Sequence, residues 1–310
     1  MQSNERRLGF KKQLIISCMS RLNYLLALTP LETWRLLRRR LPLLRNGPAW
    51  TPAELLSSAK HSRGIRYAEL LLRQEAVVRR HMPWEPLDFE GRRTVEIGCG
   101  PLAGFGPLAI FCGATLFESA EPEWDPGLSF SEPVIERYFR IFHSDLCALY
   151  GPRMDFQTFV KALHERMVIH PVGFEKSPIV GPADIVLSQS CLEHVFPLDA
   201  TVAKLAAIQN SKTRFLHLVD FGNHYPTGNP FEGLYEQPPN DYFARRGRAI
   251  NLLRAPDVVS LFTGRGISVR SIVSRTAQES YGGTIHAWWR QRYDETALFT
   301  QLALVVGPAT

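Results

Sequence analysis

Short apolar runs alternate with helix-length amphipathic segments from residue 93 onward. Segments 200–210 and 256–263 have the spacing of helices that bury one face. The apolar runs, each short enough to be one β-strand, lie at residues 94–97, 114–120, 167–170, 183–188, 214–220, 266–274 and 298–306. Strands that alternate with helices are typical of a mostly parallel sheet with helices on both faces. The pattern therefore predicts an α/β fold whose ligands bind at the carboxyl ends of the strands.

The first eighty residues have a different pattern, which predicts helices. Apolar residues at positions 15, 18, 22 and 25 recur every three or four residues and so share one helical face. Thr29–Glu32 and Thr51–Glu54 both read Thr-Pro-x-Glu, which combines a cap residue, a proline at the first helical position and a glutamate that completes a capping box. A longer helix is expected at about 66–80.

These patterns divide the chain of 310 residues into two parts. We predict a basic helical N-terminal extension or cap over residues 1–84 and an α/β domain over residues 85–310. Two connections are too long for simple crossovers, and they predict insertions at about 122–166 and 221–255. Long connections at the ligand-binding edge commonly shape a substrate site.

The positive charge is concentrated near the N-terminus. The chain has a formal net charge of +6, yet residues 1–45 alone hold ten Lys or Arg side chains against two acids. The rest is slightly acidic, which argues against a large phosphate-binding groove, so no clear nucleic-acid partner is expected. The basic segment is interpreted first as a cap, and second as a peripheral contact with an anionic membrane surface through residues 1–45.

Cysteine usage and hydropathy bear on location. The five cysteines include no C-x-x-C pair, which argues against a disulfide framework or a cysteine-rich zinc site. No apolar run approaches the ~18 residues that a membrane span needs, and a signal peptide is a poor fit. We expect a cytoplasmic protein, with a peripheral position at the inner face of a membrane as the alternative.

The strongest motif is a glycine loop that follows a predicted strand and precedes a predicted helix. Val95–Gly104 reads Val-Glu-Ile-Gly-Cys-Gly-Pro-Leu-Ala-Gly. Glycines at such a point allow a tight turn and let a ligand approach bare backbone. Taken alone, Gly98-x-Gly100-x-x-Ala103 also satisfies a loose dinucleotide-binding fingerprint.

Three further features separate this loop from a nicotinamide site. Glu96 lies inside the strand, where a dinucleotide-binding strand is normally apolar. Glu121 follows the next strand, 21 residues after Gly100, where a carboxylate can accept hydrogen bonds from ribose hydroxyls. Glu118 is a rival for that role but lies in mid-strand. Asp184–Val195 is a strand followed by a polar edge.

In these three motifs the chain resembles the class I S-adenosylmethionine-dependent methyltransferases, over about residues 85–310. The resemblance implies a Rossmann-like seven-stranded, mostly parallel sheet with helices on both faces, and a final antiparallel strand at 298–306. Two departures stand out. Leu102 occupies a position where many members have a third glycine, and residues 170–173 lack the usual Gly-Asp pair. No residues are therefore assigned to the adenine.

The resemblance also implies a set of cofactor contacts for S-adenosylmethionine. The loop would frame the methionine part, Glu121 would hold the ribose, and Ser188 and Gln189 would lie near the sulfonium. The loop residues in this set are Glu96, Gly98, Gly100 and Gly104.

A histidine-rich edge is predicted beside this loop. His194 follows the fourth strand, whereas Asp220 and His224 lie where the fifth strand gives way to a loop, so they could reach the substrate. His194 or His224 could be a general base, since an imidazole suits proton removal near neutral pH. Alternatively, these three with His217 could bind a divalent metal, although the spacing matches no firm signature, or they could tie the loop down. His217, in mid-strand, is expected to be structural, and no metal is assigned.

The second insertion and the region after it are rich in aromatic residues. Asn229-Pro230 and Asn251–Arg254 flank a stretch in which an arginine, at 245, 246, 248 or 254, could meet an anionic acceptor. An ordered loop that packs its own aromatic side chains is the alternative. Trp288 and Trp289 are interpreted as surface packing or an oligomer contact.

The predicted function is methyl transfer from S-adenosylmethionine to a small molecule or a glycan. Oxygen is the preferred acceptor atom, because a histidine base has a proton to remove there. One alternative is a protein of the same fold that binds a ligand without catalysis. The other is an NAD-dependent oxidoreductase, which Glu96 and the fourth-strand motif disfavour.

Overall fold

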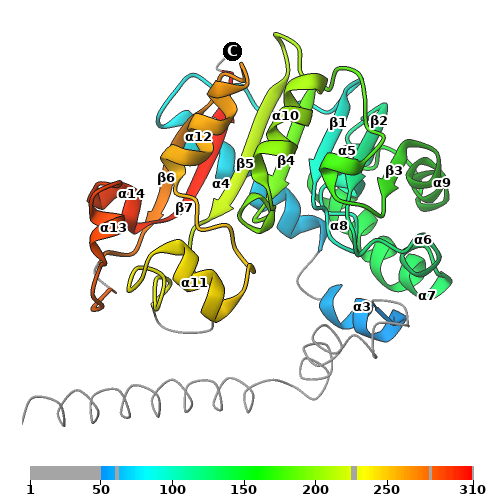
Figure 1. The fold of residues 1–310 in the computed structure, drawn as a ribbon. Coiled ribbons are helices and arrows are strands. Elements are labelled where there is room, and N and C mark those ends of the chain that lie inside the picture. Colours follow the sequence, from blue (N-terminus) through cyan, green and yellow to red (C-terminus); the bar gives the residue numbers. More distant parts are fainter. Residues whose placement is uncertain (1–49, 60–62, 225–228, 279–280, 309–310) are drawn as a thin grey trace, which may run out of the picture. The chain divides into compact units, whose positions relative to one another are not determined.

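A computed structural model describes residues 50–59, 63–224, 229–278 and 281–308 of the chain (Figure 1). The predictions for the basic segment 1–45 lie outside these residues. The chain divides into two compact units, residues 1–54 and 55–310. The sheet lies in the second of these units. Among the described residues, no helix has the length and apolar character needed to cross a bilayer.

Helix α3 (Pro52–Ser58) begins as the sequence predicts. The backbone N–H of Thr51 donates to Glu54 Oε2 at 2.7 Å, and the Glu54 N–H donates to Thr51 Oγ1 at 3.3 Å. Each side chain thus satisfies a backbone donor that the first helical turn would leave unpaired. The Thr-Pro-x-Glu interpretation of residues 51–54 is confirmed.

The sheet has seven strands in the order β3-β2-β1-β4-β5-β7-β6 (Figure 1). The first five pair in parallel, whereas β7 runs antiparallel to both β5 and β6. This confirms the predicted Rossmann-like, mostly parallel sheet and its antiparallel last strand. The strands are β1 (Arg93–Ile97), β2 (Leu116–Ala120), β3 (Met167–His170), β4 (Ile185–Gln189), β5 (Arg214–Asp220), β6 (Arg270–Thr276) and β7 (Thr300–Gly307).

The two C-terminal strands begin later than predicted. Gly266 has φ +76° and its N–H donates to the Thr263 carbonyl, so it completes a helix end before β6 starts. Leu298 belongs to helix α14 (Glu295–Phe299), whose first turn is capped by Asp294 accepting from the Ala297 N–H at 2.7 Å. Local capping chemistry therefore overrides the apolar pattern at both strand starts.

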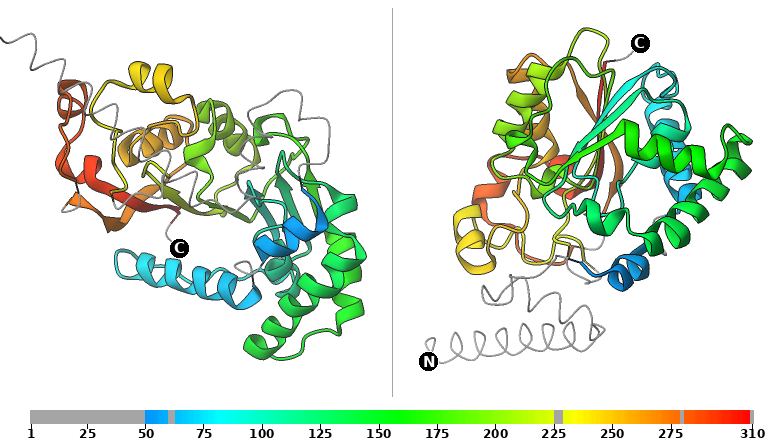
Figure 2. Two further views of the ribbon diagram at one scale, coloured as in Figure 1. Left: turned by 90° about the horizontal axis from the view of Figure 1, so that it is seen from below. Right: turned by 90° about the vertical axis from the view of Figure 1, so that its right-hand side faces the viewer.

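Helices cover both faces of the sheet, as predicted. Figure 1 and the left view of Figure 2 show α10 and α12 on one face and α4 and α8 on the other. Of the other described helices, all but α9 have eight residues or fewer. The bounds are α4 (Gly64–Arg79), α5 (Gly106–Phe111), α6 (Pro126–Ser129), α7 (Glu132–Val134), α8 (Arg140–Tyr150), α9 (Phe156–Arg166), α10 (Leu198–Ile208), α11 (Pro239–Arg246), α12 (Ala255–Gly264) and α13 (Ala287–Arg290).

The main core lies between the sheet and helices α10 and α12. It contains Val95 and Val186 from the strands together with Val202 of α10 and Phe262 of α12, all fully buried. Side chains alternate between the two faces of a strand, so this core fixes which residues of each strand can reach the opposite face.

A second core joins the predicted insertion 221–255 to the segment before β7. Trp289 is fully buried there, and its indole N–H donates to the Gln237 carbonyl at 2.8 Å. The interpretation of this tryptophan as a surface or oligomer contact is therefore wrong. Arg254 is also buried, donating to the Tyr235 hydroxyl at 2.8 Å and to the Phe221 carbonyl at 3.0 Å. It holds the core together and does not face an acceptor.

The two neighbouring tryptophans provide a matched test of this second core. Trp289→Ala should lower the free energy of unfolding by about 3–5 kcal/mol, because it opens a large cavity and leaves the Gln237 carbonyl unpaired. Trp288→Ala, at a half-buried position, should cost only about 1 kcal/mol. Urea denaturation followed by circular dichroism measures both, and equal losses would contradict this description.

Candidate functional site

The turn from β1 into helix α5 is held by a buried carboxyl group. Glu96 is 1% exposed, and its Oε2 accepts the Phe105 N–H at 2.8 Å. Gly104 has φ +49°, and a Cβ on it would lie 2.5 Å from Glu96 Oε2. Glycine at position 104 therefore lets the loop close over the carboxyl group. Leu102, the departure noted in the sequence, is buried and leaves this contact unaffected.

The two earlier glycines of the loop have different surroundings. Both have φ +68°, a backbone conformation that residues other than glycine rarely adopt. A Cβ on Gly98 would meet Cys191 Sγ at 2.3 Å, so the turn after β4 packs directly on the loop. A Cβ on Gly100 would meet nothing within 4 Å. Bare backbone at Gly100 thus faces open space, as a ligand-binding loop requires.

Glu121 lies beside this open part of the loop, just after β2. Its Oε2 accepts the Gly100 N–H at 2.8 Å, and its Oε1 accepts the Glu123 N–H at 2.9 Å. A carboxylate has about four acceptor positions, so hydrogen bonds to backbone N–H groups do not prevent it from also accepting hydroxyl donors of a ligand. The rival, Glu118, forms an ion pair with Arg93 at 2.5 Å, which occupies it elsewhere in the sheet.

Of the two residues expected near a sulfonium, Ser188 lies on the face of the sheet opposite to that of Gln189. It is buried, and its hydroxyl lies 2.8 Å from His217 Nδ1, on the face covered by α12. Gln189 is on the opposite face, where its Oε1 accepts from Gln74 of helix α4 at 2.6 Å. The structure therefore brings together the glycine loop, Glu96 and Glu121, and it leaves Ser188 out of that group.

His217 has the structural role that the sequence predicts. It is fully buried, and burial lowers the pKa of its imidazole to about 3, so the ring is neutral. It packs against Phe262 with ring centroids 5.6 Å apart and contacts the Ser188 hydroxyl. It is not part of the histidine pair at the edge of the sheet.

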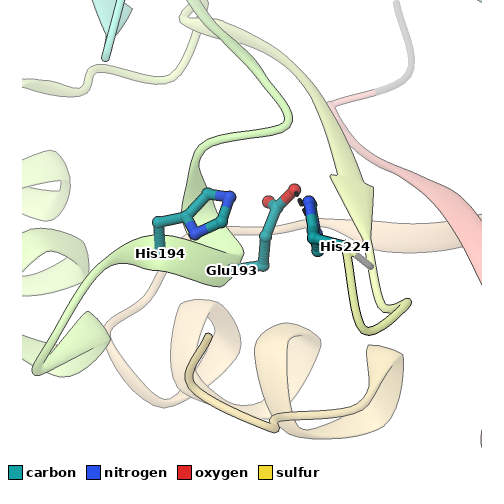
Figure 3. Close-up of side chains that lie close together, drawn as sticks. All are labelled: Glu193, His194 and His224. Atoms are coloured by element: carbon teal, nitrogen blue, oxygen red, sulfur yellow. Dashed lines mark ion pairs between the residues drawn. The ribbon is translucent and has the colours of Figure 1, made fainter. Parts of the chain in front are cut away.

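That pair is formed by His194 and His224, whose ring centroids are 4.8 Å apart. Figure 3 shows the side chain of Glu193 between the two rings, with its Oε1 3.8 Å from His224 Nε2. Asp220 takes a different part: its Oδ1 accepts the Gly222 N–H at 2.8 Å, and its own N–H donates to Glu193 Oε1 at 3.2 Å. Asp220 therefore shapes the turn and orients Glu193.

Hydrogen bonding fixes the protonated nitrogen of His194. Its Nδ1 lies 2.7 Å from the Ala249 carbonyl, and a carbonyl can only accept, so Nδ1 carries the hydrogen and Nε2 a lone pair. Partial desolvation lowers the pKa of His194, and the neighbouring His224 lowers it as well, whereas the Ala249 carbonyl opposes the shift. The ring is therefore a neutral base near pH 7.

Glu193 is the residue of this edge that sequence reasoning did not select as functional. It is 3% exposed, and its Oε2 has no hydrogen-bond partner among the described residues. Burial, helped by the charge of Asp220, raises the pKa of its carboxyl group to about 8. The sequence feature that could have identified Glu193 is its position immediately before His194, shortly after the end of a strand.

Asn251, from the second insertion, secures the short turn Leu192–His194 that carries Glu193. Its backbone N–H donates to the Glu193 carbonyl at 2.7 Å, and its side-chain amide donates to the Leu192 carbonyl at 2.7 Å. His224 lies in the left-handed region with φ +56°, a strained conformation for histidine. The insertion and the strained turn together hold the two imidazoles on either side of Glu193.

Comparisons with known proteins return structures but no sequence relatives. No family model matches this sequence, and a search of curated proteins finds no match. Three solved structures illustrate the structural matches. An S-adenosylmethionine-dependent methyltransferase from Mesorhizobium loti is 15% identical, with a TM-score of 0.39, over 74% of this chain and 95% of that one.

The other two matches are methyltransferases with stated acceptors. Phosphoethanolamine N-methyltransferase 2 from Haemonchus contortus is 13% identical, with a TM-score of 0.40, over 76% of this chain and 51% of that one. The mitomycin 7-O-methyltransferase MmcR is 14% identical, with a TM-score of 0.38, over 88% and 67%. Identity is low throughout, so the assignment of the fold rests on the strand order and on the antiparallel β7.

Two buried carboxyl groups should make the stability of the protein depend on pH. Burial, helped by the charge of Glu121, raises the pKa of Glu96 to about 8, as burial does for Glu193, against 4.5 for an ordinary glutamate. Each group takes up a proton on folding between these values, so stability falls as pH rises from about 4.5 to 8.

Glu96→Gln removes one of these titrations while keeping an acceptor for the Phe105 N–H. Its melting temperature should fall less between pH 5 and pH 8 than that of the natural protein. Glu69→Gln, which changes an exposed carboxylate on α4, should retain the full decrease. Thermal unfolding at several pH values measures all three proteins, and a Glu96→Gln protein with an unchanged decrease would refute the assignment.

Proposed function

We propose that this chain is an S-adenosylmethionine-dependent methyltransferase. The observation that carries the proposal is the contact of Glu121 with the Gly100 N–H, which puts a carboxylate beside bare loop backbone that faces open space. When bound, the cofactor supplies an electrophilic methyl group on a sulfonium. Glu121 would accept hydrogen bonds from its ribose, and the backbone of Gly98 and Gly100 would face its methionine part.

The buried Glu96 supports this cofactor over a nicotinamide. Its carboxyl group is tied to the Phe105 N–H in the first turn below the loop, and a cationic sulfonium bound nearby would favour the charged form of this carboxyl group. A nicotinamide dinucleotide carries an anionic pyrophosphate to the same position, beside Glu96 and Glu121. An anion gains no such favourable interaction from Glu96.

For the acceptor, the proposal is a hydroxyl group of a small molecule or a glycan. His194 and His224 lie at the carboxyl ends of β4 and β5, on the same edge of the sheet as the glycine loop. His194 is neutral with a free lone pair on Nε2, which suits removal of a proton from a hydroxyl as the methyl group is transferred. Asp220 contributes by orienting the turn that carries His224.

The alternative is a protein of this fold that binds S-adenosylmethionine without transferring its methyl group. The intact loop and Glu121 are compatible with it, because they concern binding alone. Transfer of a radiolabelled methyl group to a panel of hydroxyl acceptors, after binding has been demonstrated, distinguishes the two.

Glu121→Ala should weaken S-adenosylmethionine binding at least tenfold, because the ribose hydroxyls and the Gly100 N–H lose a common acceptor. Glu118→Gln is the matched control, since Glu118 pairs with Arg93 and should leave the dissociation constant unchanged. Isothermal titration calorimetry measures both. An unchanged dissociation constant in Glu121→Ala would remove the main support for the proposed site.

The two histidines are tested separately once an acceptor is found. If one of them is the base, His194→Ala or His224→Ala should lower kcat by roughly 10²–10⁴-fold with no change in cofactor affinity. Methyl transfer from radiolabelled cofactor gives kcat, and calorimetry gives the affinity. Full turnover in both variants would rule out a histidine base.

A further inference from the structure

One group of side chains has the composition and spacing of a metal-binding site. Among the described residues, Glu193, His194 and His224 form a group of potential ligands whose donor atoms all lie within 4.8 Å of one another. Figure 3 shows the carboxyl group between the two imidazoles. The three come from two separate strand ends, so the fold assembles a site that no local sequence motif encodes.

The imidazole of His194 is already oriented as a ligand. Its Nδ1–H donates to the Ala249 carbonyl at 2.7 Å, which leaves the Nε2 lone pair for an ion. Metal-binding histidines are commonly held in this way, with the second ring nitrogen donating to a carbonyl or carboxylate that fixes the tautomer and the ring orientation.

The distance between the other two ligands is also close to what a shared ion needs. Glu193 Oε1 and His224 Nε2 are 3.8 Å apart. Two donors bound tetrahedrally to one zinc ion would be roughly 3.4 Å apart, so small side-chain movements suffice. The contact of His224 Nε2 with the Asp220 carbonyl is long, at 3.4 Å, and does not commit the nitrogen to donating a hydrogen bond.

A buried acceptor without a partner provides a second, independent indication. Glu193 is only 3% exposed, and its Oε2 receives no hydrogen bond from the described residues. Buried carboxyl oxygens are normally paired with a donor or a cation. The Asn251 contacts to the backbone of the Leu192–His194 turn hold this carboxyl group in place.

We propose that Glu193, His194 and His224 bind one divalent transition-metal ion, of which Zn²⁺ is the representative. Two imidazoles and one carboxylate favour zinc, cobalt, iron or manganese over magnesium or calcium, which prefer sites made only of oxygen. Three protein ligands leave at least one coordination position for solvent or for an oxygen of a substrate.

The proposed metal site is formed by these three side chains, and metal binding there does not depend on methyl transfer. If the protein is also a methyltransferase, a hydroxyl group bound to the ion becomes more acidic and releases its proton to solvent. The ion then activates the acceptor oxygen, and the two histidines act as ligands. A histidine would act as the general base only in the protein without a bound ion.

The test uses the full chain without affinity-tag histidines, stripped of metal with a chelator and dialysed. Calorimetric titration with Zn²⁺ should show one equivalent bound, and Co²⁺ should produce the visible absorption of a low-symmetry site. Glu193→Gln, His194→Ala and His224→Ala should each weaken Zn²⁺ binding at least tenfold. His81→Ala, at an exposed position outside the group, should bind as the natural protein does.

Three results would overturn the proposal: absence of one-equivalent binding, unchanged affinity in both histidine variants, or binding of Mg²⁺ in preference to Zn²⁺. The last two would show that the imidazoles are not ligands. Titration of the metal-free protein with S-adenosylmethionine separates this outcome from the proposed function. If the cofactor binds while Zn²⁺ does not, the metal site fails alone.

Discussion

The contact between the buried Glu96 carboxyl group and the Phe105 N–H determines the shape of the ligand edge. It fixes the point at which the chain leaves β1 and enters α5, and it requires glycine at position 104. With that turn in place, Gly98 packs on Cys191 and the Gly100 N–H reaches Glu121. The loop that this buried acid holds thus contacts the residues that follow β2 and β4, at the edge where the cofactor is proposed to bind.

The histidine edge depends on packing farther along the chain. Asn251 holds the turn that carries Glu193, and the backbone carbonyl of Ala249 orients His194. This segment is anchored in turn by the second core, through buried Ile250, Leu252 and Arg254. The aromatic insertion therefore acts as a support for the site, and damage to that core should displace the imidazoles without touching them.

The sequence predicted most of the sheet because each buried strand leaves a clear apolar run, and β3 and β5 have the expected bounds. It placed Glu121 and the glycine loop correctly side by side, since parallel strands end at one edge. It did not indicate that Ser188 faces α12, because adjacent strand residues point to opposite faces, and a strand buried on both sides does not reveal which face holds the ligand. Trp289 and Glu193 were missed because their burial arises from contacts distant in sequence.

The proposed cofactor site can be tested by a parallel calorimetric titration of the purified natural protein with S-adenosylmethionine, S-adenosylhomocysteine and NAD. Saturable binding of the first two at one site, with no heat from NAD, is the predicted result. Binding of NAD alone would contradict the role assigned to Glu96 and Glu121. No binding of any of the three would show that the glycine loop does not form a cofactor site.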